Sequence, residues 1–231
     1  MKPDAAISRR EALAWFGVAG AAGVLTACSG TSSRSAGTAT TAVSTSAATC
    51  VLTPEMTEGP YHIDGEAVRS DITEGKSGAP LRLVLTVVDA TSCKAVPGAA
   101  VDVWHADATG NYSGFGSTAS NRTFLRGIQV ADANGKVDFK TLYPGWYQGR
   151  SVHIHVKVNV GGAGVHIGQL FFDEKVTGAV YAHPPYSSRT GRRTTNAQDS
   201  IFRDGGAQST LQVTPEGGGY VGALTLGVRR A

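Results

Sequence analysis

Short segments in which apolar and polar residues alternate, separated by turn-forming residues, constrain the fold of this chain more than any other feature. In the clearest segment, residues 81–89, every second residue is apolar: Leu81, Leu83, Leu85 and Val87. A period of two places these side chains on one face of a β-strand, whereas an amphipathic helix has a period near 3.6. Similar segments cover residues 100–107, 128–131, 137–142, 151–160, 168–172 and 220–228, and no convincing amphipathic helix pattern lies between them. The pattern predicts an all-β domain, an antiparallel β-sandwich.

Two connecting segments carry more specific expectations. Asn134-Gly135 lies between two strand-like segments and is the strongest short-range signal of a β-hairpin, with positive φ at both turn residues. Residues 184–208 form a long polar stretch. Long segments without regular structure are often functional in compact domains, so we expect this stretch to contribute to function.

The first 27 residues are typical of a signal peptide. Lys2, Arg9 and Arg10 precede an uncharged apolar run at residues 13–27. This run is shorter than the roughly 20 apolar residues that span a bilayer as a helix. Ser8-Arg9-Arg10 resembles a twin-arginine export signal, although Ala12 stands where that signal usually has a large apolar residue, so the general export route stays open.

Residues 25–28, Leu-Thr-Ala-Cys, resemble the lipobox of bacterial lipoproteins, in which the cysteine is acylated. We therefore expect a lipid on Cys28; the alternative is an incidental cysteine near a cleavage site. Residues 28–49 are almost wholly Ser, Thr, Ala and Gly, a composition that predicts a flexible linker. The predicted organisation is a signal peptide at 1–27, a linker at 28–49 and a folded domain at 50–231. This domain would be exported, and either anchored at the outer face of the cell membrane or secreted.

The remaining cysteines, Cys50 and Cys93, form an even pair in an exported domain and indicate a disulfide, with two buried free thiols as the alternative. The formal charge is only +3 and the charged residues are scattered, which argues against nucleic-acid binding. The sequence carries no signal of oligomeric state.

The segment most informative about chemistry is the strand predicted at residues 151–160. Val152, Ile154 and Val156 share one face of this strand, and His153 and His155 share the other. Two imidazoles about 7 Å apart at their Cα atoms can reach one metal ion. A His-x-His pair alone is weak evidence, because plain half-buried strands also contain it.

Two tyrosines, each at the end of a turn, make a metal role more specific. Tyr147 follows a Pro144-Gly145 turn, and Tyr112 follows the turn at residues 109–111. A phenol has a pKa near 10, so tyrosine binds a metal only where a strong Lewis acid removes its proton. Anionic oxygen ligands favour ferric over ferrous iron. The alternative ferrous site of two histidines and one carboxylate lacks an obvious carboxylate, with Asp173 and Glu174 the nearest candidates.

These motifs together resemble the signature of the intradiol ring-cleavage dioxygenases, which include protocatechuate 3,4-dioxygenase and catechol 1,2-dioxygenase. The resemblance extends from about residue 50 to residue 205. The matching segments are residues 57–61 (TEGPY), 101–112 (VDVWHADATGNY), 144–155 (PGWYQGRSVHIH) and 168–172 (GQLFF).

The resemblance implies that Tyr112, Tyr147, His153 and His155 bind one non-haem Fe(III) ion. It implies that Arg150 and Gln169 act beside bound substrate, and that Tyr147 takes part in catalysis as well as binding iron. The implied activity is cleavage of a catechol-type ring by O2 to cis,cis-muconate-type products. Tyr61 matches a pocket residue of the family, and the other histidines are expected to be structural or at the surface.

The chain departs from the family's best-known members at two points. The segment between Tyr147 and His153 is shorter, and no helical domain precedes the sandwich, which leaves the shape of the substrate pocket open. Two alternatives remain. One is a non-catalytic surface lipoprotein that binds a catechol, a carbohydrate or a metal chelate. The other is a zinc or copper protein that uses the His-x-His pair and a further histidine.

Overall fold

The computed structural model describes residues 50–117 and 119–229. The chain divides into units of residues 1–45 and 46–231, and the described residues all belong to the second. The predicted signal peptide, Cys28 and the linker at 28–49 lie outside the described residues. Among the residues that are described, no helix is long and apolar enough to cross a membrane.

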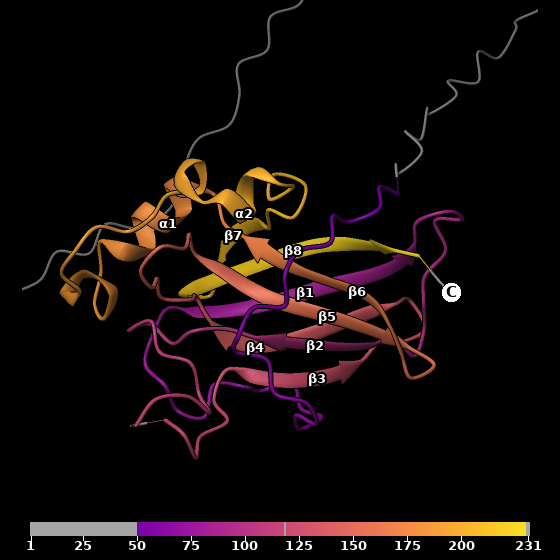
Figure 1. Cartoon of the computed structure of the whole chain (residues 1–231), viewed down its shortest axis with the longest axis horizontal. Coiled ribbons are helices and arrows are strands. Elements are labelled where there is room, and N and C mark those ends of the chain that lie inside the picture. Colours follow the sequence, from indigo (N-terminus) through magenta and orange to yellow (C-terminus); the bar gives the residue numbers. More distant parts are fainter. Residues whose placement is uncertain (1–49, 118, 230–231) are drawn as a thin grey trace, which may run out of the picture. The chain divides into compact units, whose positions relative to one another are not determined.

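Two four-stranded sheets build the domain (Figure 1). One has the order β4-β1-β8-β7 and the other β3-β2-β5-β6. The strands are β1 (Pro80–Asp89), β2 (Ala100–Trp104), β3 (Arg126–Val130), β4 (Lys136–Leu142), β5 (His153–Val160), β6 (Ala163–Phe171), β7 (Gln212–Glu216) and β8 (Gly219–Val228). Each of the seven segments predicted as strands overlaps an observed strand, and the β-sandwich prediction is confirmed.

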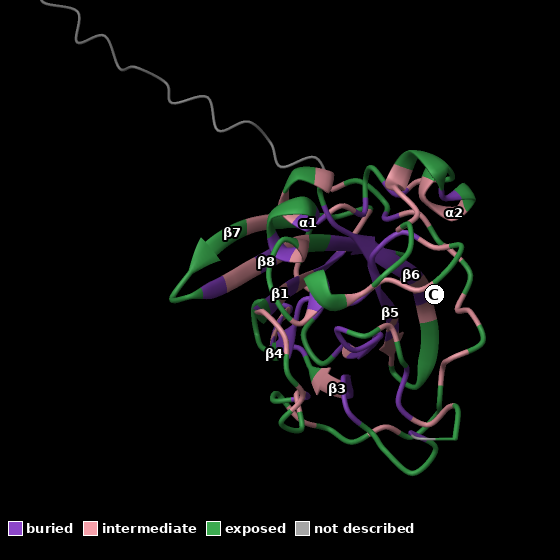
Figure 2. Ribbon diagram, turned by 90° about the vertical axis from the view of Figure 1, so that its left-hand side faces the viewer, coloured by how far each residue is buried: buried purple, intermediate pink, exposed green. Residues whose placement is uncertain are grey.

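The alternating residues form the core between the sheets. Leu83 and Leu85 of β1 and Ile154 and Val156 of β5 are all fully buried in one hydrophobic cluster. Figure 2 shows buried residues on the facing strands and mostly exposed residues on β7. Burial of each such side chain contributes roughly 1.5–3 kcal/mol, and a change of register by one residue would turn all of them to solvent.

Three sequence-based expectations need correction. First, β1 pairs with β8 in parallel, so the sandwich is not wholly antiparallel. Second, Asn134-Gly135 does not form a hairpin, because β3 and β4 belong to different sheets. Only Gly135 of this pair has a positive φ, 75°. Asp132 shapes the turn instead, since its Oδ1 accepts hydrogen bonds from the backbone N–H groups of Asn134 and Lys136.

Third, helices do occur after β6: α1 (Glu174–Tyr181), α2 (Ser200–Arg203), and the 3₁₀ turns η1 (Tyr186–Ser188) and η2 (Asn196–Gln198). They gather at one end of the sandwich (Figure 1). In α1 only Thr177 and Val180 are buried, too few to give a clear helical period. Asp173 caps this helix by accepting hydrogen bonds from the backbone N–H groups of Lys175 and Val176.

A disulfide joins Cys50, at the start of the described chain, to Cys93, just after β1, with the two Cα atoms 5.4 Å apart. It encloses the whole of β1 in a loop with a sequence separation of 43 residues.

Candidate functional site

The two histidines at the start of β5 point to the same side of their sheet. His153 and His155 are 3% and 1% exposed, and their Nε2 atoms lie 3.1 Å apart. The alternate residues Ile154 and Val156 point into the hydrophobic core. The alternation along β5 therefore fixes both imidazoles on the face opposite the core.

Two tyrosines approach this histidine pair from separate loops. Tyr147, after β4, has its Oη 3.1 Å from Nε2 of His153. Tyr112, after β2, has its ring centroid 5.6 Å from that of Tyr147 and 6.1 Å from that of His155. The buried hydroxyl of Tyr112 has no hydrogen-bond partner among the described residues. The structure thus brings the four side chains named from the sequence together at one point.

Close packing of two loops positions the tyrosines. Asp107 folds the loop that leads to Tyr112, because its Oδ1 accepts hydrogen bonds from the backbone N–H groups of Thr109 and Asn111. Gly145, two residues before Tyr147, donates its N–H to the carbonyl of Asp107 at 3.1 Å. The segments that carry the two phenols therefore contact each other directly through their backbones.

Burial sets the charge state of the site. It lowers the pKa of His153 to about 3 and that of His155 well below its ordinary value, so both imidazoles are neutral near pH 7. His153 Nδ1 lies 2.7 Å from the carbonyl oxygen of Ser151 and donates to it, which leaves the Nε2 lone pair directed into the site. Burial raises the pKa of both Tyr112 and Tyr147. The phenols therefore stay protonated unless a cation lies beside them.

This donor set fits a trivalent metal ion. Two neutral imidazole nitrogens and two phenol oxygens converge, and one of those oxygens is buried without a partner, which is costly in the absence of a ligand. A trivalent cation would offset the burial that raises both phenol pKa values, and two phenolates would neutralise most of its charge. Tyr112, Tyr147, His153 and His155 are the residues that would hold it.

Arg150 and Gln169 lie next to this group and bind each other. An Nη2 hydrogen of Arg150 is donated to Oε1 of Gln169 at 2.5 Å. Gln169 is the neighbour of His155 on β6, fully buried, and its Nε2 donates to the carbonyl of Thr57. A guanidinium thus stands beside the candidate metal ligands on a fixed support.

Two further residues support His155. Trp104, its neighbour on β2, stacks on the imidazole with ring planes 5° apart and centroids 4.9 Å apart. Gly59, in the segment before β1, comes so close that a Cβ there would lie 3.1 Å from Cε1 of His155, and the φ of Gly59 is +73°. His155 therefore packs against an aromatic ring and against a backbone segment that only glycine allows.

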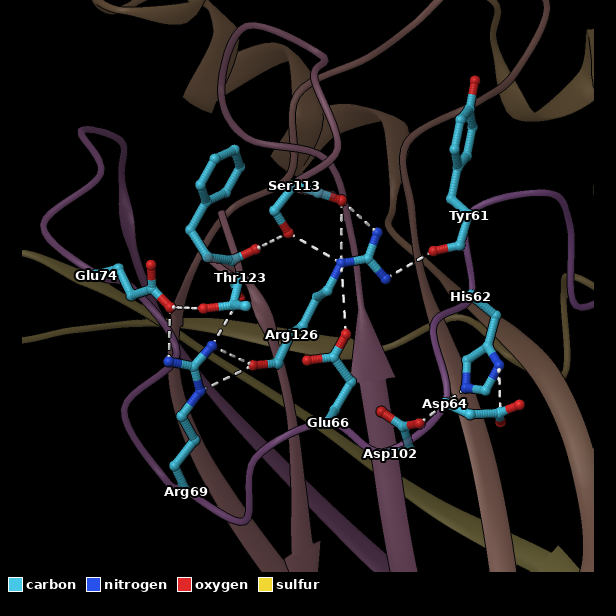
Figure 3. A network of polar contacts seen from close by, with 11 residues as sticks. Tyr61, His62, Asp64, Glu66, Arg69, Glu74, Asp102, Ser113, Thr123 and Arg126 are labelled. Atoms are coloured by element: carbon cyan, nitrogen blue, oxygen red, sulfur yellow. Dashed lines mark hydrogen bonds and ion pairs between the residues drawn. The ribbon is translucent and has the colours of Figure 1, made fainter. Parts of the chain in front are cut away.

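A buried polar network joins Tyr61 to Ser113, the residue that follows Tyr112 (Figure 3). Its centre is Arg126, 1% exposed, which donates to the carbonyl oxygens of Tyr61 and Ser113 and lies 3.8 Å from Glu66. Tyr61 stacks on Tyr112 with centroids 4.2 Å apart. Arg126 thereby links the loop that carries Tyr61 to the residue that follows Tyr112.

The remaining histidines lie outside the group of four. His62 binds Asp102 and Glu58, and His105 binds Thr141. His166 is buried against Gly168, and His183 is exposed. These positions agree with the structural or surface roles expected for them.

The two carboxylates considered as ligands are engaged elsewhere. Asp173 caps α1, and Glu174 binds Arg193 and the backbone N–H of Asn196. A carboxylate that the sequence did not reveal, Asp199, lies beside Arg150 with its Oδ2 3.0 Å from Nε. No periodicity or motif marks Asp199, although it falls in the polar segment 184–208 that we expected to be functional.

Comparison with known proteins assigns the fold to a family. The sequence matches the family model described as Dioxygenase over residues 53–177. A solved intradiol ring-cleavage dioxygenase from Tetranychus urticae is 38% identical, with a TM-score of 0.75, and the match covers 78% of this chain and 95% of that chain. This chain belongs to the intradiol ring-cleavage dioxygenase family, as the sequence motifs predicted.

Two curated relatives are also similar. Catechol 1,2-dioxygenase 1 of Acinetobacter lwoffii is 38% identical over 101 residues, which are 41% of this chain and 32% of that protein. Chlorocatechol 1,2-dioxygenase of Rhodococcus opacus is 27% identical over 139 residues, 52% of this chain and 54% of that protein. The matches therefore span about a third to about half of the length of these relatives.

Proposed function

We propose that this protein cleaves the ring of catechol-type compounds between the two hydroxylated carbons, using O2 and one non-haem Fe(III) ion. Both oxygen atoms enter the product, a cis,cis-muconate-type dicarboxylic acid, so no other oxidant or reductant is needed. The observation that carries the proposal is the convergence of two phenols and two neutral imidazoles on one point. The names of the relatives, catechol and chlorocatechol 1,2-dioxygenases, support the substrate class.

The bound ferric ion would supply Lewis acidity and make a chelated catecholate reactive toward O2. The chain's own residues would manage the protons. A catechol that binds as a dianion releases two protons; the phenolate oxygen of Tyr147 is placed to accept one of them, and hydroxide from solvent would take up the other to give water. Tyr147 is less buried than Tyr112, so of the two phenols it is the one that we expect to move aside. With two tyrosines in the site, Tyr147 could be displaced by substrate while Tyr112 would still help to hold the ion.

Arg150 would stabilise the negative charge of the bound catecholate as the ring is attacked. Its guanidinium lies beside the histidines and is held by Gln169. Fixed donors of this kind typically contribute 10²- to 10³-fold to kcat, because they need no reorganisation during the reaction. Gln169 would orient Arg150 and would not itself exchange protons.

The visible spectrum of the ferric-loaded protein tests this proposal. Ferric phenolate absorbs strongly by charge transfer, so the protein should be coloured, and anaerobic addition of catechols should shift the band. Tyr147→Phe should shift or weaken the band and abolish turnover. Tyr220→Phe is the matched control, because Tyr220 is half-buried on β8 and belongs to the other sheet.

A colourless ferric-loaded protein that instead binds zinc stoichiometrically would contradict the proposal and favour a zinc protein built on the His-x-His pair. An unchanged spectrum and rate in Tyr147→Phe would remove Tyr147 from the ligand set. A panel of plain catechol, protocatechuate and hydroxyquinol in the same titration would define the substrate.

We also propose that the domain is exported and anchored through a lipid on Cys28. The support is the sequence around residues 9–28 and the Ser/Thr/Ala-rich segment that follows. Cys28→Ala should move the protein from the membrane fraction to the soluble fraction, and continued membrane association would refute the anchor. Replacing Arg9 and Arg10 by Lys should block export if the twin-arginine route is used; unaffected export would indicate the general route.

A further inference from the structure

Asp199 is a buried carboxylate that the proposed chemistry does not yet use. It lies immediately before α2, and its side chain is 1% exposed. Its Oδ1 accepts hydrogen bonds from the backbone N–H groups of Ile201 and Phe202, which caps α2. Capping alone does not explain the burial, because a four-residue helix needs no charged group shielded from solvent.

The second oxygen of Asp199 accounts for its burial. Oδ2 accepts hydrogen bonds from Nε of Arg150 at 3.0 Å, from the backbone N–H of Ser151 at 2.8 Å and from Oγ of Ser151 at 2.9 Å. A carboxylate removed from water is stable where a cation and several donors replace its hydration. Asp199 is therefore built into the support of the Arg150-Ser151 pair.

Asp199 and Gln169 together fix the plane of the guanidinium. Asp199 binds Nε and Gln169 binds Nη2, so two of the three nitrogens of Arg150 are occupied. The third, Nη1, has no hydrogen-bond partner within residues 50–117 and 119–229. Because guanidinium is a rigid planar fork, these two anchors also determine where Nη1 points.

The same carboxylate reaches one of the histidines through Ser151. Asp199 holds both the N–H and the hydroxyl of Ser151, and the carbonyl of Ser151 accepts the Nδ1 hydrogen of His153 at 2.7 Å. Such an acceptor fixes the tautomer and the ring orientation of a metal-binding histidine. One side chain thus supports both the residue beside the substrate and a residue of the metal-binding group.

We propose that Asp199 is a positioning residue for ring cleavage: it holds Arg150 with its Nη1 free for the bound catecholate and, through Ser151, orients His153. This inference rests on the proposed function. It assigns a catalytic contribution to the helical segment after β6, which contacts the site through this residue.

Asp199→Asn tests the proposal, and Asp173→Asn is the matched control. Both aspartates cap a helix in the same way, with Oδ1 accepting from the second and third N–H groups that follow. Only Asp199 also binds Arg150 and Ser151. Asp199→Asn should lower kcat by about 10- to 100-fold, the usual effect of losing an outer-shell partner. Asp173→Asn should keep kcat within twofold of wild type.

A double-mutant cycle identifies the route of the effect. In an Arg150→Gln background, Asp199→Asn should lower kcat by a smaller factor than in the wild type, because the guanidinium that Asp199 positions is gone. An equal factor in both backgrounds, or a kcat within twofold of wild type in Asp199→Asn itself, would overturn the proposal. If the Asp199→Asn protein does not fold, Asp199→Glu takes its place in the same cycle. This variant keeps the negative charge but shifts its position.

A readout without turnover separates this inference from the proposed function. In protein loaded with Ga(III), a diamagnetic trivalent ion, the NMR signal of the Arg150 Nε–H can be assigned by its loss in Arg150→Lys. Its exchange with solvent should be at least tenfold faster in Asp199→Asn than in wild type or Asp173→Asn. Equal exchange in all three would overturn the positioning role. A wild-type protein that keeps this protection but turns over no catechol would refute the proposed function instead.

Discussion

Gly145 lies where the loop before Tyr147 meets the loop before Tyr112, and substituting it tests how the site is assembled. A Cβ at this position would stand 2.2 Å from the carbonyl oxygen of Asp107 and 2.6 Å from the carbonyl carbon and oxygen of Ala108. A carbon–oxygen contact ordinarily needs about 3.3 Å or more. Gly145→Ala must therefore push the two loops apart by about 1 Å. The φ of Gly145 is not positive, so the effect is steric and not a matter of backbone strain.

The expected cost has a structural and a catalytic part. Overpacking of this kind typically destabilises by about 1–3 kcal/mol, and the lower entropy of the unfolded alanine chain offsets about 0.4–1 kcal/mol of it. A net loss of about 1–2 kcal/mol corresponds to a Tm lower by about 2–8 °C for a domain of this size. Separation of the tyrosines by about 1 Å should also lower kcat about 100-fold and shift the ferric phenolate band.

Thermal unfolding, the visible spectrum and kcat should be measured on Gly145→Ala and on Gly178→Ala as the control. Gly178 lies within α1, and nothing comes within 4 Å of a Cβ there. Alanine should stabilise that helix slightly and leave the spectrum unchanged. A Gly145→Ala protein with the Tm, band and rate of the wild type would show that the loops do not set the distance between the phenols.

Two further predictions concern stability. Burial lowers the pKa of His105 to about 4. As pH falls from about 6.5 to 4, His105 is therefore protonated in the unfolded chain but not in the folded chain, and the free energy of unfolding decreases. His105→Asn should make the decline of Tm over this range less steep, and an identical pH dependence in both proteins would contradict it. The disulfide of Cys50 and Cys93, with its 43-residue separation, should contribute about 4 kcal/mol by chain entropy. A reducing agent should therefore lower the Tm of the wild type but not that of Cys93→Ser; a wild-type Tm insensitive to reduction would refute this.

The sequence predicts the parts of this protein that depend on local pattern. The alternation along β5 places His153 and His155 on one face without any knowledge of the rest of the fold. The strand signal of β1 is equally local and was read correctly to within one residue at its start. Turn residues near Tyr112 and Tyr147 indicate that each follows a strand, and the structure has them in the loops after β2 and β4.

Long-range relations could not be read in this way. The parallel pairing of β1 with β8 joins segments more than 130 residues apart, and no local pattern encodes it. The contact between Arg150 and Asp199 spans 49 residues and depends on how the helical segment folds back. Strand β7 was missed because four of its five residues are exposed and it contains Pro215, so it lacks a buried alternating face.

The disulfide fixes where the described chain enters the domain. The strand β1 begins next to the end of β4, which leads to Tyr147, and it runs away from there toward Cys93. Cys50, bonded to Cys93, therefore lies near the far end of β1, and Figure 1 shows the helices gathered toward the other end of the sandwich. Under the proposed anchoring through Cys28, the disulfide would fix the point at which the linker joins the domain, at the end of β1 that lies away from Tyr147.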